Sequence, residues 1–177
     1  MQGTLKNDSW DFISANRMLM WVANNGALSH DPLTLGPGLE WPKGSGRMLA
    51  YSEGLVVAGL VEGEVRVSGS TYTYGWQAGN ILSDGTASDP SSAVHRIFRA
   101  HRFESAWWAA QTRTEQERLL RDFLEWPVAL GAPWNDANAN GTYDPDTTAW
   151  LSGASTDAPL LPGDEVLWFV SNDLDSR

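Results

Sequence analysis

Short apolar runs separated by turn residues dominate the pattern along this chain. Runs rich in Val, Leu, Tyr and Trp alternate with clusters of Gly, Pro, Asp, Asn and Ser, and the 17 Gly and 9 Pro leave pieces too short for a helical fold. The pattern predicts six strands, at residues 17–22, 48–51, 55–61, 64–67, 96–98 and 166–170. We therefore expect an all-β fold, mainly an antiparallel β-sandwich or jelly-roll.

Two turn signals predict hairpins. Glu53-Gly54 separates the second and third strands, and Glu62-Gly63 separates the third and fourth. Glycine readily adopts the positive φ that tight hairpin turns require. Because sequential strands usually pair, we expect a meander over residues 47–67.

One segment departs from the strand pattern. Thr114-Glu115-Gln116-Glu117 matches a capping box, in which the Thr hydroxyl accepts a backbone N–H and Glu117 reaches back. An apolar stripe at three- and four-residue spacings follows, formed by Leu119, Leu120, Phe123 and Leu124. The pattern leaves Arg118, Arg121 and Asp122 for solvent. It predicts one short helical insertion that ends before Pro127.

Composition narrows the possible partners. A chain of 177 residues suits one β-rich domain over residues 1–177. The net charge of -10 argues against a nucleic-acid partner, and the lack of cysteine excludes disulfides, thiolate zinc sites and a cysteine nucleophile. The sequence has no apolar window of membrane-spanning length, so we expect no membrane insertion, and its first fifteen residues lack the apolar run that a signal peptide needs. Since a predicted strand lies close to the end of the chain, we expect a fragment of a longer protein.

The segment from Asp136 to Asp146 carries the clearest chemistry. Its sequence places oxygen-bearing side chains at alternate positions around Gly141, a spacing typical of calcium loops. The first, third and fifth ligand positions fall on Asp136, Asn138 and Asn140. Thr142 offers its backbone carbonyl at the seventh position, and Asp144 offers a carboxylate at the ninth, directly or through water. The sequence therefore predicts Ca2+ as the cofactor.

The loop departs from the full calcium pattern at its end. The twelfth position, where a bidentate Glu normally completes the shell, is Thr147, and Asp146 is the nearest substitute. Pro127 and Pro133 interrupt any helix leading into the loop, so we expect an isolated calcium loop and not a helix-loop-helix sensor. An Asn-Gly turn held by side-chain hydrogen bonds, without a metal, is the alternative interpretation.

Several short segments rich in Gly, Trp and Pro together resemble a known type of protein region. They are Asn16-Arg17-Met18, residues 38–46, Gly59-Leu60-Val61, residues 68–72, residues 126–134 and residues 161–168. Their order resembles the amino-terminal region of very large secreted proteins of Bacteroidetes type that carry a type IX secretion signal. The resemblance covers roughly residues 14–172. It implies a secreted or cell-surface setting and no assigned catalytic residues.

The sequence offers little support for an enzyme. His30, His95 and His101 lie in no zinc or nucleophile motif. A glycosidase needs two carboxylates about 5 to 9.5 Å apart, a distance that sequence does not supply. Glu40, Glu53, Asp164 and Glu165 are the acids to inspect for such a pair.

The ten tryptophans favour a second function. Aromatic rings on the surface of a β-sandwich can stack on sugars. Trp21, Trp76 and Trp168 lie in or near strand patterns, so we expect them in the core. The sequence places Trp41, Trp134 and Trp150 in loops and makes them the candidate ligand-binding residues.

These features together predict a non-enzymatic, calcium-stabilised structural or adhesive module. Its expected partners are calcium and, beyond it, neighbouring domains or copies of itself. A carbohydrate-binding module that recognises glycans through loop tryptophans is the alternative, and a glycoside hydrolase is third.

Overall fold

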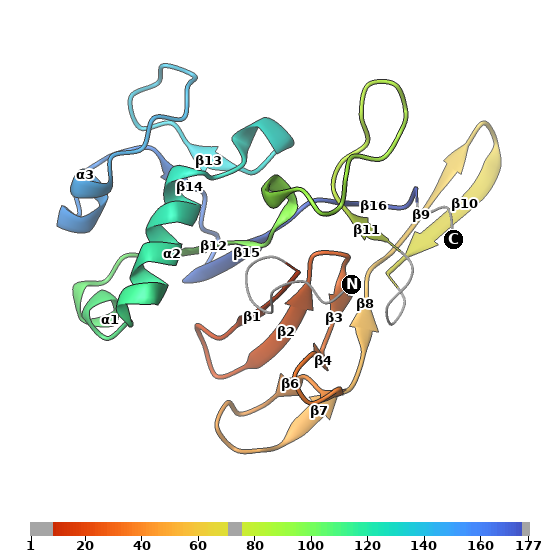
Figure 1. The fold of residues 1–177 in the computed structure, drawn as a ribbon, viewed down its shortest axis with the longest axis horizontal. Coiled ribbons are helices and arrows are strands. Elements are labelled where there is room, and N and C mark those ends of the chain that lie inside the picture. The colour runs from red at the N-terminus through yellow and green to blue at the C-terminus, as the bar shows by residue number, and fades with distance from the viewer. Residues whose placement is uncertain (1–8, 71–75, 175–177) are drawn as a thin grey trace. The chain divides into compact units, whose positions relative to one another are not determined.

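The chain folds mainly as short strands in several antiparallel sheets with few helices (Figure 1). The computed structural model describes residues 9–70 and 76–174. Contacts along the chain divide it into two compact units. Unit 1 combines Met1–Ile97 with Phe169–Arg177, and unit 2 is Phe98–Trp168. The single domain expected over residues 1–177 stays a prediction.

Unit 1 is built from strands and one 3-10 turn. In chain order these are β1 (Trp10–Ile13), β2 (Leu19–Ala23), β3 (Ala27–Leu28), β4 (His30–Asp31), β5 (Gly36–Pro37), β6 (Leu39–Glu40), β7 (Met48–Ala50), β8 (Glu53–Gly54), β9 (Val56–Val61), β10 (Glu64–Gly69), β11 (Gln77–Ala78), η1 (Ala93–His95) and β16 (Ser171–Asn172). In the largest sheet β2 pairs with β1, β3 and β6, while β7 pairs with β6 and β8 with β3. All of these pairings are antiparallel, and β11 pairs with β16 in the same sense.

The core of unit 1 centres on β2. Trp21, Val22 and Ala23 are all buried, and the ring of Trp21 meets that of Phe12 edge-on at 5.2 Å between centroids. Neighbouring residues of a strand point to opposite faces. Strand β2 is therefore covered on both faces, which explains its continuous apolar sequence.

The second predicted hairpin is confirmed. Strands β9 and β10 pair antiparallel from Val56↔Gly69 to Val61↔Glu64. The connecting residues Glu62 and Gly63 have φ of 54° and 84°. Positive φ at both central positions is typical of the tight turns that match the twist of a hairpin.

The first predicted hairpin, across Glu53-Gly54, is wrong. These two residues form β8, which pairs with β3, while β7 pairs with β6. A Cβ on Gly54 would lie 1.6 Å from the carbonyl oxygen of Ser70. The glycine is therefore present because another backbone segment approaches closely, not because the chain turns.

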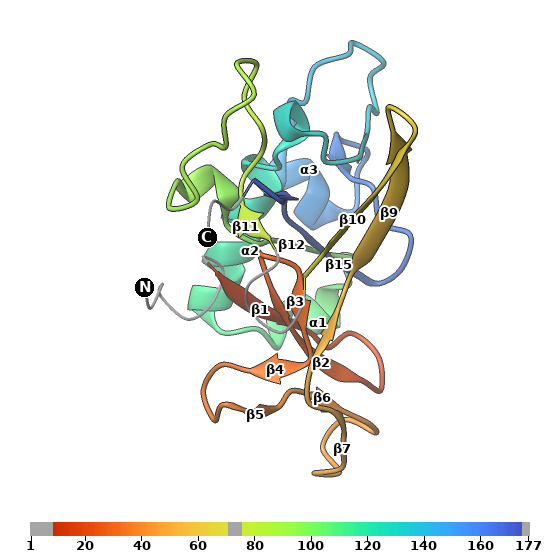
Figure 2. The same cartoon turned by 90° about the vertical axis from the view of Figure 1, so that its right-hand side faces the viewer.

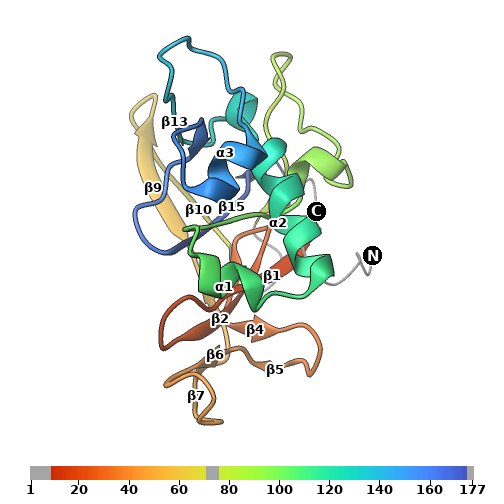
Figure 3. The ribbon, with the colours of Figure 1, turned by 90° about the vertical axis from the view of Figure 1, so that its left-hand side faces the viewer.

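Unit 2 contains the helices. Its elements are β12 (Phe98–His101), α1 (Ser105–Ala109), α2 (Arg113–Leu124), η2 (Val128–Leu130), β13 (Trp134–Asn135), α3 (Thr147–Ser152), β14 (Ala158–Pro159) and β15 (Glu165–Trp168). β12 pairs with β15, and β13 pairs with β14. Figure 3 shows α2 with α1 and α3 near it. The described residues hold three α-helices where the sequence predicted one. Helices α1 and α3 are too short for a helical repeat of apolar residues to be recognised in the sequence.

The core of unit 2 is aromatic. Phe98 and Trp126 are buried, and their rings meet edge-on at 6.2 Å between centroids. Phe98 meets Trp168 in the same way at 6.3 Å. Trp168 is partly buried against this cluster, as the strand pattern at 166–170 led us to expect.

Helix α2 is confirmed, but its cap and its buried face differ from the prediction. The N-cap is Thr112, whose side chain accepts the N–H of Glu115, so the cap lies two residues before the predicted Thr114. Leu119 and Phe123 are buried, whereas Leu124 is 51% exposed. Asp122 was expected in solvent and is fully buried, because its Oδ2 accepts the backbone N–H of Arg99 at 3.1 Å from β12.

Most predicted strands match observed ones within two residues at each end. Segments 17–22, 48–51, 55–61, 64–67 and 166–170 correspond to β2, β7, β9, β10 and β15. Segment 96–98 corresponds to β12, which begins only at Phe98. The missed strands are mostly two residues long and are defined by their pairing partners, so no local pattern marks them.

Candidate metal centre

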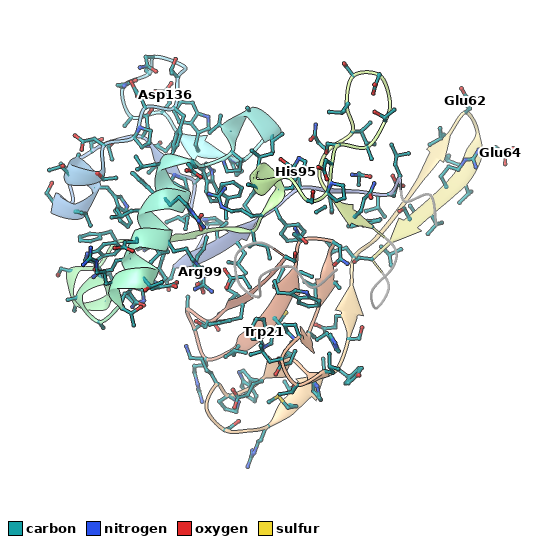
Figure 4. The ribbon with its side chains drawn as sticks, in the orientation of Figure 1. Trp21, Glu62, Glu64, His95, Arg99 and Asp136 are labelled. Carbon is teal, nitrogen blue, oxygen red and sulfur yellow. The ribbon has the colours of Figure 1, made fainter. Side chains whose placement is uncertain are left out.

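The predicted calcium loop lies in unit 2 between β13 and α3. It leaves β13 at Asn135, and Figure 4 marks Asp136 at its start. Strand β13 is tied to β14, which holds the beginning of the loop to the segment that follows α3. The loop is therefore anchored by regular structure on both sides.

Asp136 organises the turn of the loop. Its Oδ1 accepts the N–H of Asn140 at 3.1 Å, and its Oδ2 accepts the N–H of Gly141 at 2.8 Å. Gly141 adopts a φ of 74°, and a Cβ there would meet no atom within 4 Å. Backbone conformation, not space, is what favours glycine at this position.

The alternate side chains repeat one hydrogen-bond pattern. Asn138 Oδ1 accepts the N–H of Asn140 at 3.0 Å, and Asn140 Oδ1 accepts the N–H of Thr142 at 2.7 Å. These bonds fix the direction of both amide oxygens. Since an amide oxygen has two lone pairs, one N–H bond leaves the other for a cation.

Asp144 completes the cluster. Its Oδ1 accepts Asn138 Nδ2 at 3.0 Å, and its Oδ2 accepts Asn140 Nδ2 at 3.1 Å. The side chains at the third, fifth and ninth positions are therefore joined by hydrogen bonds, and Asp136 at the first position is linked to them through the backbone N–H of Asn140, which it shares with Asn138 Oδ1. Two carboxylates, two carboxamides and the Thr142 backbone carbonyl provide oxygen atoms of the kind that Ca2+ prefers, although the amide Nδ2 atoms, and not the amide oxygens, face Asp144 in this structure.

Asp146 has a different position. Its Oδ1 accepts the N–H groups of Thr148 at 2.7 Å and of Ala149 at 3.2 Å, which makes it the N-cap of α3. Its backbone N–H donates to Thr156 Oγ1 at 2.7 Å. The structure thus places one oxygen of the predicted substitute ligand in a helix cap.

Asp157 holds the loop, although the sequence did not single it out as a site residue. The residue is 1% exposed, and its carboxylate accepts the N–H of Ala137 at 2.9 Å and the N–H of Asp144 at 3.0 Å. The bond from the Asp144 N–H is the main reason that the pKa of Asp157 lies below its usual value. No local pattern marks this residue, because it lies thirteen positions beyond the nearer of its two partners.

Tyr143 joins the loop to the core of unit 2. Its hydroxyl donates to the carbonyl of Phe123 at 2.5 Å, and its ring lies edge-on to Trp134 at 5.4 Å between centroids. Burial, and secondarily the charge of Asp157, raises the pKa of its hydroxyl. One side chain inside the loop is thus part of the hydrophobic core, which limits how far the loop can move.

The predicted ligand-binding tryptophans are not alike. Trp134 lies in β13 against Tyr143, and Trp150 lies in α3, stacked on Phe123 at 4.9 Å between centroids. Only Trp41 lies outside the strands and helices, and it is 50% exposed. Of the tryptophans expected in the core, Trp21 is buried and Trp76 is partly buried.

The candidate catalytic groups are held by structural contacts. His95 is buried in unit 1, where its Nδ1 lies 2.8 Å from the carbonyl oxygen of Asp89, and His101 stacks on Trp107 at 3.6 Å. Glu53 accepts the hydroxyl of Ser29, while Glu165 pairs with Arg99 at 3.2 Å. Glu40 accepts the N–H of Gly46 at 2.6 Å, and Asp164 lies 3.6 Å from Arg102.

Three aspartates of unit 1, outside the loop, also organise turns. Asp31 Oδ1 accepts the N–H of Leu33, Asp84 Oδ1 accepts that of Thr86, and Asp89 Oδ1 accepts that of Ser91. These side-chain bonds are the ones that Asp makes two residues ahead in a turn. These turns of unit 1 therefore offer control positions for substitutions in the loop of unit 2.

Neither the other described residues nor known proteins add to the description of this loop. Across residues 9–70 and 76–174, no three His, Cys, Asp or Glu side chains gather in a metal-binding group, and no helix has the length and apolar character needed to cross a membrane. The cluster in the loop has two carboxylates and takes its remaining donors from amides and the backbone. Comparison of the chain with protein-family models, curated proteins and solved structures gives no match.

Proposed function

We propose that the chain is a non-enzymatic, calcium-stabilised structural or adhesive module of a secreted or cell-surface bacterial protein. The observation that supports this most is the arrangement around the turn at Gly141, where Asp144 accepts the side-chain amides of Asn138 and Asn140 while Asp136 accepts the backbone N–H groups of the turn. The resemblance of the sequence to regions of large secreted proteins supports the setting. A β-sandwich arrangement of the sheets belongs to the same proposal.

Calcium would act on the loop by neutralising charge. Asp136 and Asp144 contribute two negative charges to one short segment, and a divalent cation offsets their repulsion. Thr147 begins α3 and supplies no closing carboxylate, so we expect a dissociation constant of about 0.1 to 1 mM, as in extracellular calcium modules. At a hundredfold excess of calcium over that constant the folded state gains about 2.7 kcal/mol.

The first test is the melting temperature of the full chain in EGTA and in millimolar calcium. We expect calcium to raise it, magnesium to raise it less, and Asp136→Ala to remove the calcium effect, because Asp136 supplies the first ligand and organises the turn. Asp84→Ala is the matched control, since Asp84 makes a similar turn in unit 1. No calcium-dependent shift in the wild-type chain would refute the calcium centre.

Asp146→Ala separates two roles of that residue in the same assay. If Asp146 serves α3 as its N-cap, the variant loses about 1 kcal/mol of stability and keeps its calcium response. A lost calcium response would instead make Asp146 a ligand, as the sequence suggested.

Glycan binding is a second candidate, favoured by the exposure of Trp41. Its ring is half exposed, and Met48 and Leu49 on the neighbouring β7 are 51% and 63% exposed. An exposed indole ring beside such aliphatic side chains can stack on a sugar ring. Titration of a glycan panel, with Trp41→Ala as the control, tests this function, and a flat response to every sugar counts against it.

A further inference from the structure

The β9–β10 hairpin of unit 1 has one face without a single polar side chain. Residues opposite each other in an antiparallel pair share a face of the sheet. The register places on one face the pairs Val56↔Gly69, Ala58↔Val67 and Leu60↔Val65. The other face carries Val57↔Ser68, Gly59↔Arg66 and Val61↔Glu64. The first set is called the apolar face below.

The apolar face is open to solvent. The exposed fractions are 68% for Val56, 74% for Leu60, 72% for Val65 and 66% for Val67. Figure 2 shows β9 and β10 running together as a narrow ribbon, and Figure 1 shows this ribbon continuing from β8 away from the main sheet of unit 1. Four large aliphatic side chains in water on one surface indicate an interaction site.

The edges of the hairpin are open as well. Within the described residues β9 and β10 pair only with each other. An isolated two-stranded hairpin is only marginally stable in water. Strand β9 reads Val-Val-Ala-Gly-Leu-Val, without a charge or a proline to discourage pairing with another chain. The hairpin therefore needs a cover to be stable.

We propose that the cover is the same apolar face of a second copy of this chain. A two-fold axis presents one surface to itself, so an interface of this kind must be self-complementary. Two sheets pack through apolar faces about 10 Å apart. The apolar face meets both conditions, because it is uniformly aliphatic.

The charges of the hairpin fit this arrangement. Glu62 lies in the turn with Glu64 near it (Figure 4). The register puts Glu64 and Arg66 on the opposite face. Packing of the two apolar faces therefore buries no charge, although each chain carries a net charge of -10. A contact through the opposite face would bring the Glu64 and Arg66 of both copies out of water, which is costly.

The available area is enough for a weak dimer. The four large side chains expose roughly 100 Å² each, and with Ala58 and Gly69 the face offers about 500 Å² per copy. Two copies together bury about 1,000 Å², the lower limit for a specific interface. We therefore expect a dissociation constant in the range of about 1 to 100 μM.

This inference rests on the proposed function, because self-association is one way in which a structural or adhesive module joins its neighbour. It places the contact in the hairpin and not in the calcium loop, which belongs to unit 2. The two proposals can therefore fail separately. A calcium-dependent melting temperature in a chain that never dimerises would overturn the dimer alone.

Sedimentation of the full chain across about 5 to 500 μM tests the dimer directly. We expect a monomer–dimer equilibrium that Leu60→Lys shifts to monomer by at least tenfold in dissociation constant. Val61→Lys is the matched control on the opposite face, next to Leu60 on the same strand, and keeps the dimer. A monomer at every concentration, or equal effects of the two variants, would overturn the inference.

Disulfide trapping provides a second measurement that tolerates a weak dimer. The chain has no cysteine, so each variant carries one thiol. Val67→Cys on the apolar face and Val57→Cys on the opposite face are matched, with 66% and 60% exposure of the original side chains. We expect mild oxidation to cross-link Val67→Cys at least tenfold faster. Equal cross-linking rates would contradict the dimer. Slow hydrogen exchange of the hairpin amides in a monomeric chain would also contradict it, because another part of the same chain would then cover the hairpin.

Discussion

Three aspartates around the loop have different roles at the scale of single residues. Asp136 binds the backbone at the turn, Asp157 joins the two ends of the loop, and Asp146 caps the next helix. All three accept backbone N–H groups, but only Asp157 is buried while doing so. Because Asp157 is buried, its charge contributes more than that of the other two aspartates to the conformation of the metal-free loop.

Asp157 predicts a specific dependence on pH. Its pKa in the folded chain lies below that of an unfolded aspartate, about 3.9, so the ionised form stabilises the fold. That stability is complete above about pH 5 and is lost as the pH falls through the folded pKa. We expect Asp157→Asn to have a lower melting temperature than the wild-type chain at pH 7 in EGTA. We also expect its melting temperature to fall less than that of the wild-type chain between about pH 5 and pH 2.

Thermal melts over that pH range check this expectation. Asp84→Asn is the control, because the pKa of Asp84 is also lowered, through its bond from the Thr86 hydroxyl, while its side chain lies on the surface. If the melting temperatures of Asp157→Asn and the wild-type chain change in parallel with pH, the ionised Asp157 carboxylate does not stabilise the fold.

Helix α2 illustrates the scale of the element. Its N-terminus is fixed by Thr112, whose side-chain oxygen lies 3.2 Å from the N–H of Glu115. Its interior is fixed by Leu119, Phe123 and the buried carboxylate of Asp122, which binds the backbone of β12. A polar contact therefore sets the position of the helix along the strand, and apolar contacts supply most of the burial.

The cap of α2 gives a prediction with a close control. Thr112→Ala should lower the free energy of unfolding by about 1 kcal/mol, because the first turn loses the acceptor for one N–H group. Thr114→Ala, two residues away inside the helix, should change it by less than about 0.5 kcal/mol. Urea denaturation of both variants measures the difference, and a larger loss in Thr114→Ala would restore the cap that the sequence suggested.

At the scale of the whole molecule, the calcium loop belongs to one of the two compact units. Unit 2 contains the loop, its anchor Asp157 and the aromatic core that Tyr143 joins. Unit 1 contains the exposed hairpin. The two proposed interaction sites are thus separate in the chain and can be studied independently.

Calcium should therefore stabilise unit 2 more than unit 1. Hydrogen exchange of the full chain, with and without millimolar calcium, should show added protection in β13, β14 and the loop between β13 and α3, because ligand binding raises the free energy of local opening. Residues of β2 and β9 should change little. Equal gains in protection across both units would contradict a local calcium site.

Local sequence determined the features whose causes are local. The β-rich character, the turn at Glu62-Gly63, helix α2 and the loop around Gly141 all follow from residues within a few positions of one another. Positive φ, apolar periodicity and alternate oxygen-bearing side chains can be read without a partner segment.

Only the tertiary structure decided the features that depend on distant contacts. Gly54 is a strand residue because the backbone of Ser70 approaches it, Asp122 is buried because β12 offers an N–H group, and Asp157 anchors the loop from beyond α3. The same holds for Trp134 and Trp150, which are packing residues because aromatic partners elsewhere in unit 2 surround them. Each of these roles is fixed by what folding brings next to the residue, so no pattern along the chain could reveal it.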